Sequence, residues 1–186
     1  MNADPREGER TREPKGMRGA NGGSRVRSSS QSFSFRRLPK RKRPAHGVFP
    51  EGGKPVIVFV TVCTKERRPW LVTAECHGLL CEVWREATSW LVGRYVVMPN
   101  HVHLFASPYD ETVSLETWMR YWKRLFTQRG ADCDRQWQSG HWDRRLRSTE
   151  SYAQKWDYVR HNPVRYGLVA DPAEWPFQGE IHELAW

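Results

Sequence analysis

The sequence predicts an α+β fold of the ferredoxin-like, or split βαβ, class. This is an antiparallel four-stranded sheet with two helices on one face, here followed by an additional C-terminal helix. Short β-branched runs alternate with longer segments whose apolar residues recur at helical spacing, in the order β-α-β-β-α-β and then α. Gly, Pro and charged residues separate these segments. No internal repeat of 20 residues or more is visible, which argues against a repeat architecture.

The composition changes near residue 50, and this change defines the domain organisation. Residues 1–50 are rich in Gly, Ser, Arg and Pro and contain none of the 10 Trp. Such a segment does not bury enough apolar surface to offset its ordering entropy. We therefore predict a disordered basic tail over residues 1–50 and a folded domain over residues 51–186, which is long enough to bury a core.

The excess positive charge belongs to the tail. Residues 1–50 hold 13 Lys and Arg against 4 Asp and Glu, whereas the remaining 136 residues hold 17 of each sign. The pI of about 9.7 is therefore no sign of a basic face on the domain. The run Arg36–Pro44 places six cations in nine residues. It fits a phosphate-contacting arm, a solvated tail, or an extension upstream of a later start at Met17.

The first half of the domain predicts a strand, a helix and two further strands. Residues 56–64 are β-branched and aromatic, as in a strand buried on both faces. Residues 73–88 have apolar side chains at three-four spacing and indicate a helix capped by Thr73. Strands follow at about 93–98 and 101–107, separated by a Pro-Asn break.

The second half predicts another helix and a short strand. A helix over about 114–128 begins at Ser114 as its N-cap and ends at Gly130. The segment that follows starts with turn residues, and we expect the fourth strand of the sheet over residues 141–146.

A last helix precedes an irregular C-terminal segment. The helix is expected to begin at Ser148 or Thr149 and to run to Asn162, where Pro163 ends it. The remainder is expected to be irregular and to pack back on the domain through four apolar side chains. They are Leu168, Val169, Trp175 and Phe177.

Two histidines separated by one residue open the strand at 101–107. Side chains alternate faces along a strand, so His101 and His103 leave from the same face. Imidazoles fixed in this way can occupy two positions on one metal ion. Two structural histidines in a half-buried strand would show the same spacing, and for an isolated His-x-His that is the commoner situation.

The last predicted helix carries a tyrosine on its polar face. Tyr152, Trp156 and Val159 form a narrow apolar stripe that docks on the protein. Tyr158 and Asn162 are four residues apart on the opposite face. We infer that the phenol of Tyr158 points outward, with the amide one turn along on the same side.

Together, these residues suggest chemistry at phosphorus. A phenol with a pKa near 10 is a poor nucleophile unless something polarises its target. A metal held by His101, His103 and the amide oxygen of Asn162 would bind a non-bridging phosphate oxygen and offset developing charge. Attack by Tyr158 would then give a phosphotyrosine bond. Without that context, Tyr158 would be a surface aromatic.

Three segments resemble one family. PNHVHL, residues 99–104, resembles the HUH motif (His, bulky hydrophobic residue, His) of the single-tyrosine DNA transposases. WDYVRHNPVRYGLV, residues 156–169, followed by EWPF, is similar to the C-terminal signature of their REP-associated branch, the REP-associated tyrosine transposases. WQSGHWDRRLRSTESY, residues 137–152, resembles the stretch that precedes it, so the likeness extends from about Val56 to Phe177. HVH alone is unspecific, but HVH together with Tyr-x-x-x-Asn-Pro-Val-Arg at this separation is specific.

The resemblance implies a metal-dependent enzyme that cuts single-stranded DNA and transfers the strand. It makes His101 and His103 ligands of a divalent ion, Mg²⁺ or Mn²⁺. Asn162 matches the third ligand, which is Gln in many relatives outside the REP branch. Tyr158 matches the nucleophile, which leaves a 5′-phosphotyrosine and a free 3′-OH. The long basic tail departs from the compact family pattern.

Two other tyrosines compete for the nucleophile's role, and the metal is open. Tyr152 lies on the docked stripe and Tyr166 follows the Pro break, so neither is expected to face Asn162. Two imidazoles and an amide oxygen suit Mn²⁺ or a softer ion better than Mg²⁺, although cells supply more Mg²⁺. Zinc also fits the sequence, and no general base is evident.

The expected partner is single-stranded DNA that contains a hairpin. Cations on the helices and the fourth strand are predicted to contact its backbone. They are Arg120, Lys123, Arg124, Arg144, Arg145 and Lys155. The alternative is a non-catalytic nucleic-acid binding module on the same fold, although the strands lack the aromatic pattern of RNA-binding sheets. Both a monomer and a homodimer fit the sequence, with Tyr158 supplied by either subunit.

The sequence indicates neither a membrane protein nor a secreted one. No apolar run approaches the length of a membrane span, and the N-terminus lacks the apolar core of a secretory signal. The four cysteines form no Cys-x-x-Cys pair. We therefore expect a cytoplasmic protein in a reducing environment.

Overall fold

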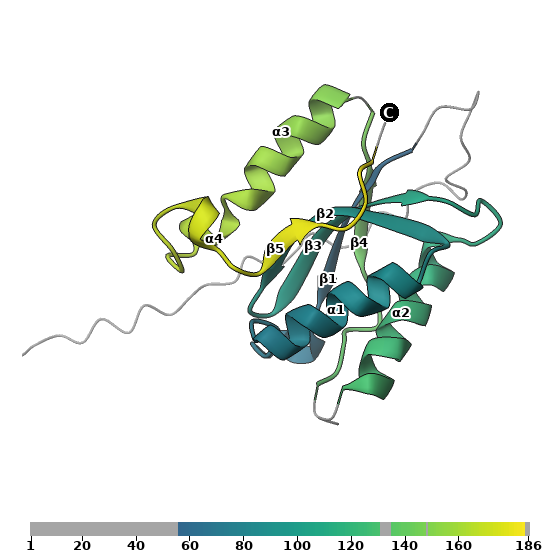
Figure 1. Cartoon of the computed structure of the whole chain (residues 1–186), viewed down its shortest axis with the longest axis horizontal. Helices are drawn as coiled ribbons and strands as arrows, with labels where there is room; N and C mark the ends of the chain where they lie inside the picture. Colours follow the sequence, from purple (N-terminus) through teal and green to yellow (C-terminus); the bar gives the residue numbers. More distant parts are fainter. Residues whose placement is uncertain (1–55, 131–134, 148, 185–186) are drawn as a thin grey trace, which may run out of the picture. The chain divides into compact units, whose positions relative to one another are not determined.

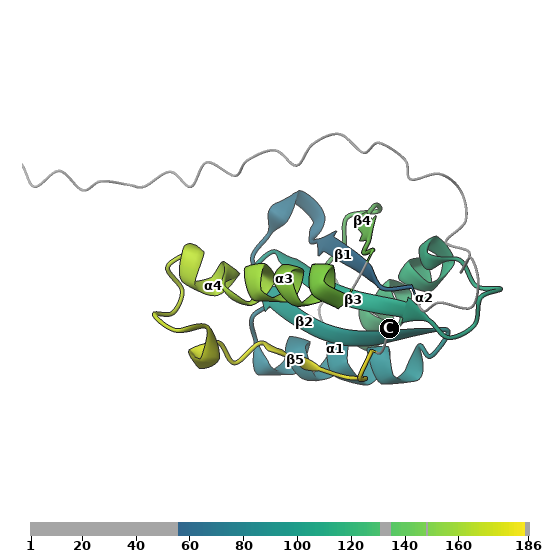
Figure 2. The same cartoon turned by 90° about the horizontal axis from the view of Figure 1, so that it is seen from above.

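Five antiparallel strands form the sheet, in a computed structural model that describes residues 56–130, 135–147 and 149–184. The strands lie in the order β4-β1-β3-β2-β5 (Figure 1). Their bounds are Val58–Cys63 for β1, Trp90–Met98 for β2, His101–Pro108 for β3, Trp142–Arg145 for β4 and Gln178–Glu180 for β5. Figure 2 shows β4 and β5 at opposite edges of the sheet. The tail predicted over residues 1–50 lies outside the described residues.

Strand β1, an interior strand of the sheet, is buried along its whole length because both faces of the sheet are covered. Val58, Val60 and Val62 belong to a core under one face, whereas Phe59 belongs to a second core on the opposite face. A strand that is buried on both faces is largely apolar, which is why the sequence of β1 shows no polar alternation, with Thr61 as the exception.

Helices α1 (Ala74–Glu86) and α2 (Leu115–Arg129) cover the first face. The predicted N-caps are confirmed, since the side chain of Thr73 accepts from the amide of Cys76 and that of Ser114 accepts from the amide of Thr117. Gly130 follows α2 as its C-cap, as predicted. Tryptophans dominate the layer between helices and sheet, and four of them are buried. They are Trp84, Trp90, Trp118 and Trp122.

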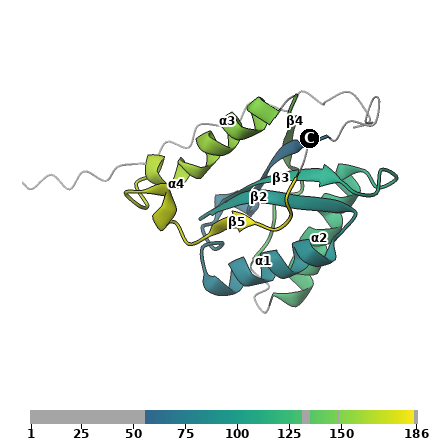
Figure 3. The ribbon, with the colours of Figure 1, turned by 45° about the horizontal axis from the view of Figure 1, so that its top comes forward.

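Helix α3 (Thr149–Arg160) covers the second face, on the other side of the sheet from α1 and α2 (Figure 3). Tyr152 and Val159 are buried there, and Trp156 packs beside them, which confirms the predicted docking stripe. Tyr152 packs edge-on against Phe105 of β3, with ring centroids 4.9 Å apart. This helix therefore lies directly over the face from which odd-numbered β3 side chains project.

The predicted end of α3 is wrong. The helix ends at Arg160, and Asn162 begins a separate helix, α4 (Asn162–Arg165), with Pro163 in its first turn. Proline lacks an amide hydrogen, which a first turn does not need, so Pro163 starts a new helix and does not merely end the old one.

The expectation of an irregular C-terminus and a four-stranded sheet is also wrong. Residues Pro172–Glu174 form a 3-10 turn, and β5 then pairs with β2 as a fifth strand. Trp175 anchors the segment, since its indole nitrogen donates to the carbonyl of Val97 at 2.9 Å. Leu168, expected to be packed, is 41% exposed.

Within the described residues, no helix is long and apolar enough to cross a membrane.

Gly93 in β2 tests how tightly the C-terminal segment is attached. A Cβ at Gly93 would lie 2.6 Å from Cγ and Cδ1 of the buried Leu184. We expect Gly93→Ala to lower the free energy of unfolding by about 1–3 kcal/mol through overpacking. The additional change Leu184→Ala should recover part of this loss, which a double-mutant cycle in urea unfolding measures.

The matched control is Gly78→Ala in α1, where a Cβ would meet no atom within 4 Å. This change should stabilise the protein by about 0.5–1 kcal/mol, as expected for a helix interior. Equal effects of the two substitutions would contradict close packing at Gly93.

Candidate functional site

The side chains of His101 and His103 converge on one point at the start of β3. Their Nε2 atoms lie 3.2 Å apart, and the ring planes are nearly perpendicular at 81°. The shared face follows from the strand register, because both residues project toward α3 while Val102 between them faces α1 and α2. The prediction that both imidazoles leave from one face is confirmed.

A polar partner holds the other nitrogen of each ring. Nδ1 of His101 donates to the amide oxygen of Asn100 at 2.7 Å, since that oxygen can only accept. Nδ1 of His103 and the hydroxyl of Thr61 on β1 lie 2.9 Å apart. Hydrogen bonds of this kind orient the imidazole of a metal-binding histidine and leave Nε2 with its lone pair. The sequence did not lead us to predict a role in the site for Asn100 or Thr61. The pairing of β1 with β3, which places Thr61 opposite His103, is the signal that could have identified Thr61.

Both imidazoles are held in their neutral form. Burial lowers the pKa of His101 to about 4, with a further contribution from the charge of Arg67. For His103, burial lowers the pKa well below its ordinary value of 6.5, and His101, Lys155 and Arg67 act in the same direction. A neutral imidazole is the form that binds a metal.

The donor set fits a divalent ion. Two nitrogens about 2.1 Å from one ion, and 90 to 110° apart around it, lie roughly 3.0 to 3.4 Å from each other, which brackets the observed separation. Among the described residues, no cluster of three or more His, Cys, Asp or Glu side chains forms a metal site. Within these described residues, a third protein ligand would be of another type, such as an amide oxygen.

The phenol of Tyr158 lies on the outer side of α3 and is 53% exposed. Two cations contact its ring: the ammonium of Lys155 lies 4.8 Å and the guanidinium of Arg165 4.0 Å from the ring centroid. The same ammonium lies 4.6 Å from the centre of Phe59, which stacks on His103. Lys155 thus connects the tyrosine with the histidine pair.

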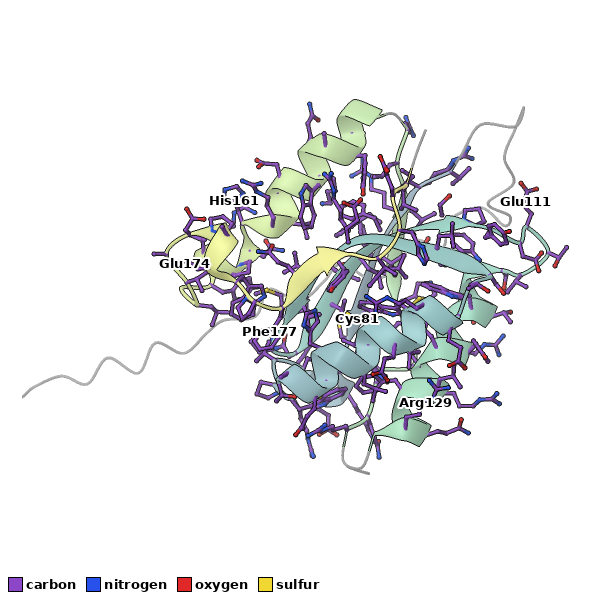
Figure 4. All side chains as sticks on the ribbon, in the orientation of Figure 1. Cys81, Glu111, Arg129, His161, Glu174 and Phe177 are labelled. Atoms are coloured by element: carbon purple, nitrogen blue, oxygen red, sulfur yellow. The ribbon has the colours of Figure 1, made fainter. Side chains whose placement is uncertain are left out.

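Asn162 is buried at the start of α4, and its side-chain oxygen accepts from Arg165 at 3.4 Å. Figure 4 marks His161, the residue between α3 and α4. Because Asn162 belongs to a second helix, the expected continuous polar face from Tyr158 to Asn162 does not exist. A residue one turn after Asn162, at the end of α4, nevertheless contacts the histidines.

That contact is made by Tyr166, which the sequence did not predict to lie near the histidines. Its ring centroid is 6.4 Å from that of His101, and the side chain is 39% exposed. Tyr166 is the C-cap of α4, where its amide donates to the carbonyl of Asn162, and its ring lies beside that of His101 on β3. Proximity alone therefore does not select Tyr158 over Tyr166.

Comparison with known proteins settles the family. A REP-associated tyrosine transposase of Escherichia coli strain K12 is 30% identical to this chain over 131 residues, which cover 68% of this chain and 78% of the relative. The chain belongs to the REP-associated tyrosine transposases. No family model matches it.

The fold is that of a REP-associated transposase as well. A solved structure of such a transposase bound to a REP hairpin superposes with a TM-score of 0.56, over 69% of this chain and 88% of the other. The sequence identity in that comparison is 24%. At this identity the match concerns the mixed α/β fold with its antiparallel sheet.

The cations predicted to contact DNA in this transposase lie on two faces of the sheet. Arg144 on β4 pairs with Phe59 and faces α3, and its charge contributes to the lowered pKa of Lys155. Arg120 and Arg124 are exposed on α2, which covers the opposite face. Figure 4 labels Arg129 on the same helix. Arg145 is exposed on the edge strand β4.

Lys123 does not fit the prediction of a DNA contact. Its side chain is buried, and its ammonium donates to the carbonyls of Gln138 and Gly140 at 3.0 and 3.1 Å. The sequence analysis grouped Lys123 with the cations expected to contact DNA, whereas the loop before β4 folds over it. Burial lowers the pKa of Lys123 to about 8, a shift partly opposed by Cys63.

This burial makes stability depend on pH above neutrality. Between pH 8 and the unfolded lysine pKa of about 10.4, the unfolded chain holds more protons at this position, so stability rises with pH. Relative to Lys123→Met, the free energy of unfolding of the wild type should rise by roughly 3 kcal/mol across this interval. Urea unfolding of both proteins at pH 7.5, 9 and 10.5 measures the difference, and a flat difference would contradict a buried charged Lys123.

Proposed function

We propose that this transposase cleaves single-stranded DNA beside a hairpin and transfers the strand through a 5′-phosphotyrosine on Tyr158. The convergence of His101 and His103 at 3.2 Å, in a chain that belongs to this family, carries the proposal. Strands β4, β1, β3 and β2 in that order, with α1 and α2 on one face, support a ferredoxin-like scaffold with β5 added at its edge.

The histidines and Asn162 are the proposed ligands of Mg²⁺ or Mn²⁺. When bound, such an ion would neutralise charge on a non-bridging phosphate oxygen and orient the phosphorus. The residues around the ligands support this role. Asn100 and Thr61 fix the two rings, and burial keeps both of them neutral.

Tyr158 is the proposed nucleophile. Its hydroxyl oxygen forms a bond with phosphorus, the bond from phosphorus to the 3′ oxygen breaks, and the phenol loses its proton. The departing 3′ oxygen takes up a proton and becomes a free 3′-OH. Strand transfer reverses these steps with another 3′-OH. The exposed position on α3 leaves the phenol open to a strand that enters from solvent.

A single strand fits the site better than a duplex. The scissile phosphate has to reach both Tyr158 on α3 and the histidine pair on β3, and in a duplex the complementary strand would have to enter with it. Lys155 and Arg144 lie on this side of the sheet and supply charge for the backbone. The hairpin proposal is supported by the related transposase, whose structure contains a REP hairpin.

Substitution of single tyrosines tests the nucleophile. With labelled single-stranded DNA that contains a REP hairpin, and with Mg²⁺ or Mn²⁺, the wild type should form an adduct that survives denaturation. Tyr158→Phe should lose the adduct, because the attacking oxygen is absent.

Tyr166→Phe is the matched control, since the ring of Tyr166 lies beside that of His101 and the substitution removes only its hydroxyl. It should retain adduct formation. The opposite pattern would make Tyr166 the nucleophile. Retention of DNA by the wild type without any adduct would support the non-catalytic binding module.

Substitution of the histidines tests the metal site. His101→Ala should reduce cleavage to background, because one ligand is lost, while the affinity for hairpin DNA falls by less than about 3-fold, since phosphate contacts dominate it. Quenching of protein fluorescence by Mn²⁺ should also disappear. His182→Ala, on the C-terminal segment, removes a histidine outside this site and should change neither readout.

A further inference from the structure

We propose that Arg165 is a positioning residue that aligns Tyr158 with Asn162. The inference rests on the function proposed above and adds a residue to that site. Arg165 is the last residue of α4, at the surface, and its guanidinium contacts both of the helices that carry the two groups.

Three contacts of one side chain carry the inference. Nη1 of Arg165 donates to the backbone carbonyl of Tyr158 at 2.7 Å. The same nitrogen lies 3.4 Å from Oδ1 of Asn162, a longer and weaker contact. The guanidinium carbon lies 4.0 Å from the centroid of the Tyr158 ring. One rigid, planar group therefore touches the backbone and ring of the nucleophile and the oxygen of the third ligand.

The need for such a group follows from the break between the helices. If α3 had continued through Asn162, hydrogen bonds within the helix would have fixed Tyr158 relative to it. Instead, α3 ends at Arg160 and α4 starts two residues later, so the angle between the helices is set by contacts across the junction. His161 makes one of them, to the carbonyl of Asp157 at 2.7 Å, and Arg165 makes the contact that involves Tyr158.

An exposed phenol also needs a restraint on its ring. Tyr158 is half exposed, and its ring rests on the cations of Arg165 and Lys155. Removal of either cation would allow the side chain of Tyr158 to adopt more rotamers. Misplacement of a reacting group by about 1 Å can cost on the order of 100-fold in rate, so a small loss of alignment has a measurable effect.

A purely structural role is the competing explanation. The carbonyls in the last turn of a helix lack partners, and a cation there both caps them and interacts favourably with the helix dipole. Arg165 meets this description for α3. A lysine would serve as a cap equally well, but a single ammonium does not span the carbonyl, the ring and the amide oxygen as a guanidinium does.

The test compares Arg165→Lys and Arg165→Gln with the wild type and with Arg160→Gln. Arg160 is a matched control on α3, with its guanidinium paired to Asp157 at 3.5 Å. For each protein we would measure the single-turnover rate of adduct formation at saturating hairpin DNA, the DNA affinity and the thermal midpoint. We expect both Arg165 variants to lose about 10- to 100-fold in rate with less than about 3-fold change in affinity. Arg160→Gln should keep the wild-type rate.

A readout independent of turnover follows the contact itself. Fluorotyrosine placed at position 158 gives a ¹⁹F resonance that reports on the ring's surroundings. In Arg165→Gln this resonance should move toward that of the free amino acid, and in Arg160→Gln it should stay in place.

The outcomes separate the explanations. Full rescue of the rate by Arg165→Lys would reduce Arg165 to a helix cap and overturn the inference. A weaker affinity with an unchanged rate at saturation would make it a DNA contact and would also overturn it. A wild-type rate of adduct formation together with an unchanged ¹⁹F resonance in Arg165→Gln would also overturn the inference. If the wild type forms no adduct, the proposed function itself fails, whatever the variants do.

Discussion

The pairing of β1 with β3 is the constraint on which the site depends. Its register sets Thr61 opposite His103 and Cys63 opposite His101, so the two histidines and the hydroxyl that orients one of them come from two adjacent interior strands of the sheet. Hydrogen bonds to the neighbouring strands on both sides restrict the positions of the side chains of a strand. Two imidazoles 3.2 Å apart would therefore need no movement of the backbone to bind the proposed ion.

The two faces of the sheet are used differently. The face under α1 and α2 is a layer of aliphatic and tryptophan side chains. The face under α3 joins an apolar core, centred on Phe105 and Tyr152, to the polar cluster around the histidines. Phe59 lies at the border, since it contacts Phe105, His103 and the ammonium of Lys155. The site thus gains rigidity from the core beside it.

Tyr158, the proposed nucleophile, is held less firmly than the histidines, and the proposed chemistry accounts for this difference. Under the proposed function, a metal ligand would have to be fixed before the substrate arrives, whereas Tyr158 would have to approach phosphorus, carry the DNA end and then release it. The phenol lies on a surface helix and is restrained by cations, not by packing. Contacts of this kind are weaker than core packing and can be exchanged for phosphate contacts.

The sequence alone determined what depends on local chemistry. The caps at Thr73 and Ser114, the shared face of His101 and His103, and the docking stripe of α3 each follow from neighbouring residues and a fixed period. The tertiary structure decided what depends on distant segments. Thr61 meets His103 across 42 residues, Lys123 is covered by a loop 15 residues away, and β5 finds β2 at the end of the chain. The split between α3 and α4, and the return of Tyr166 to His101, have the same origin. Such contacts depend on burial and strand pairing across the whole domain, so the periodicity of a single segment does not predict them.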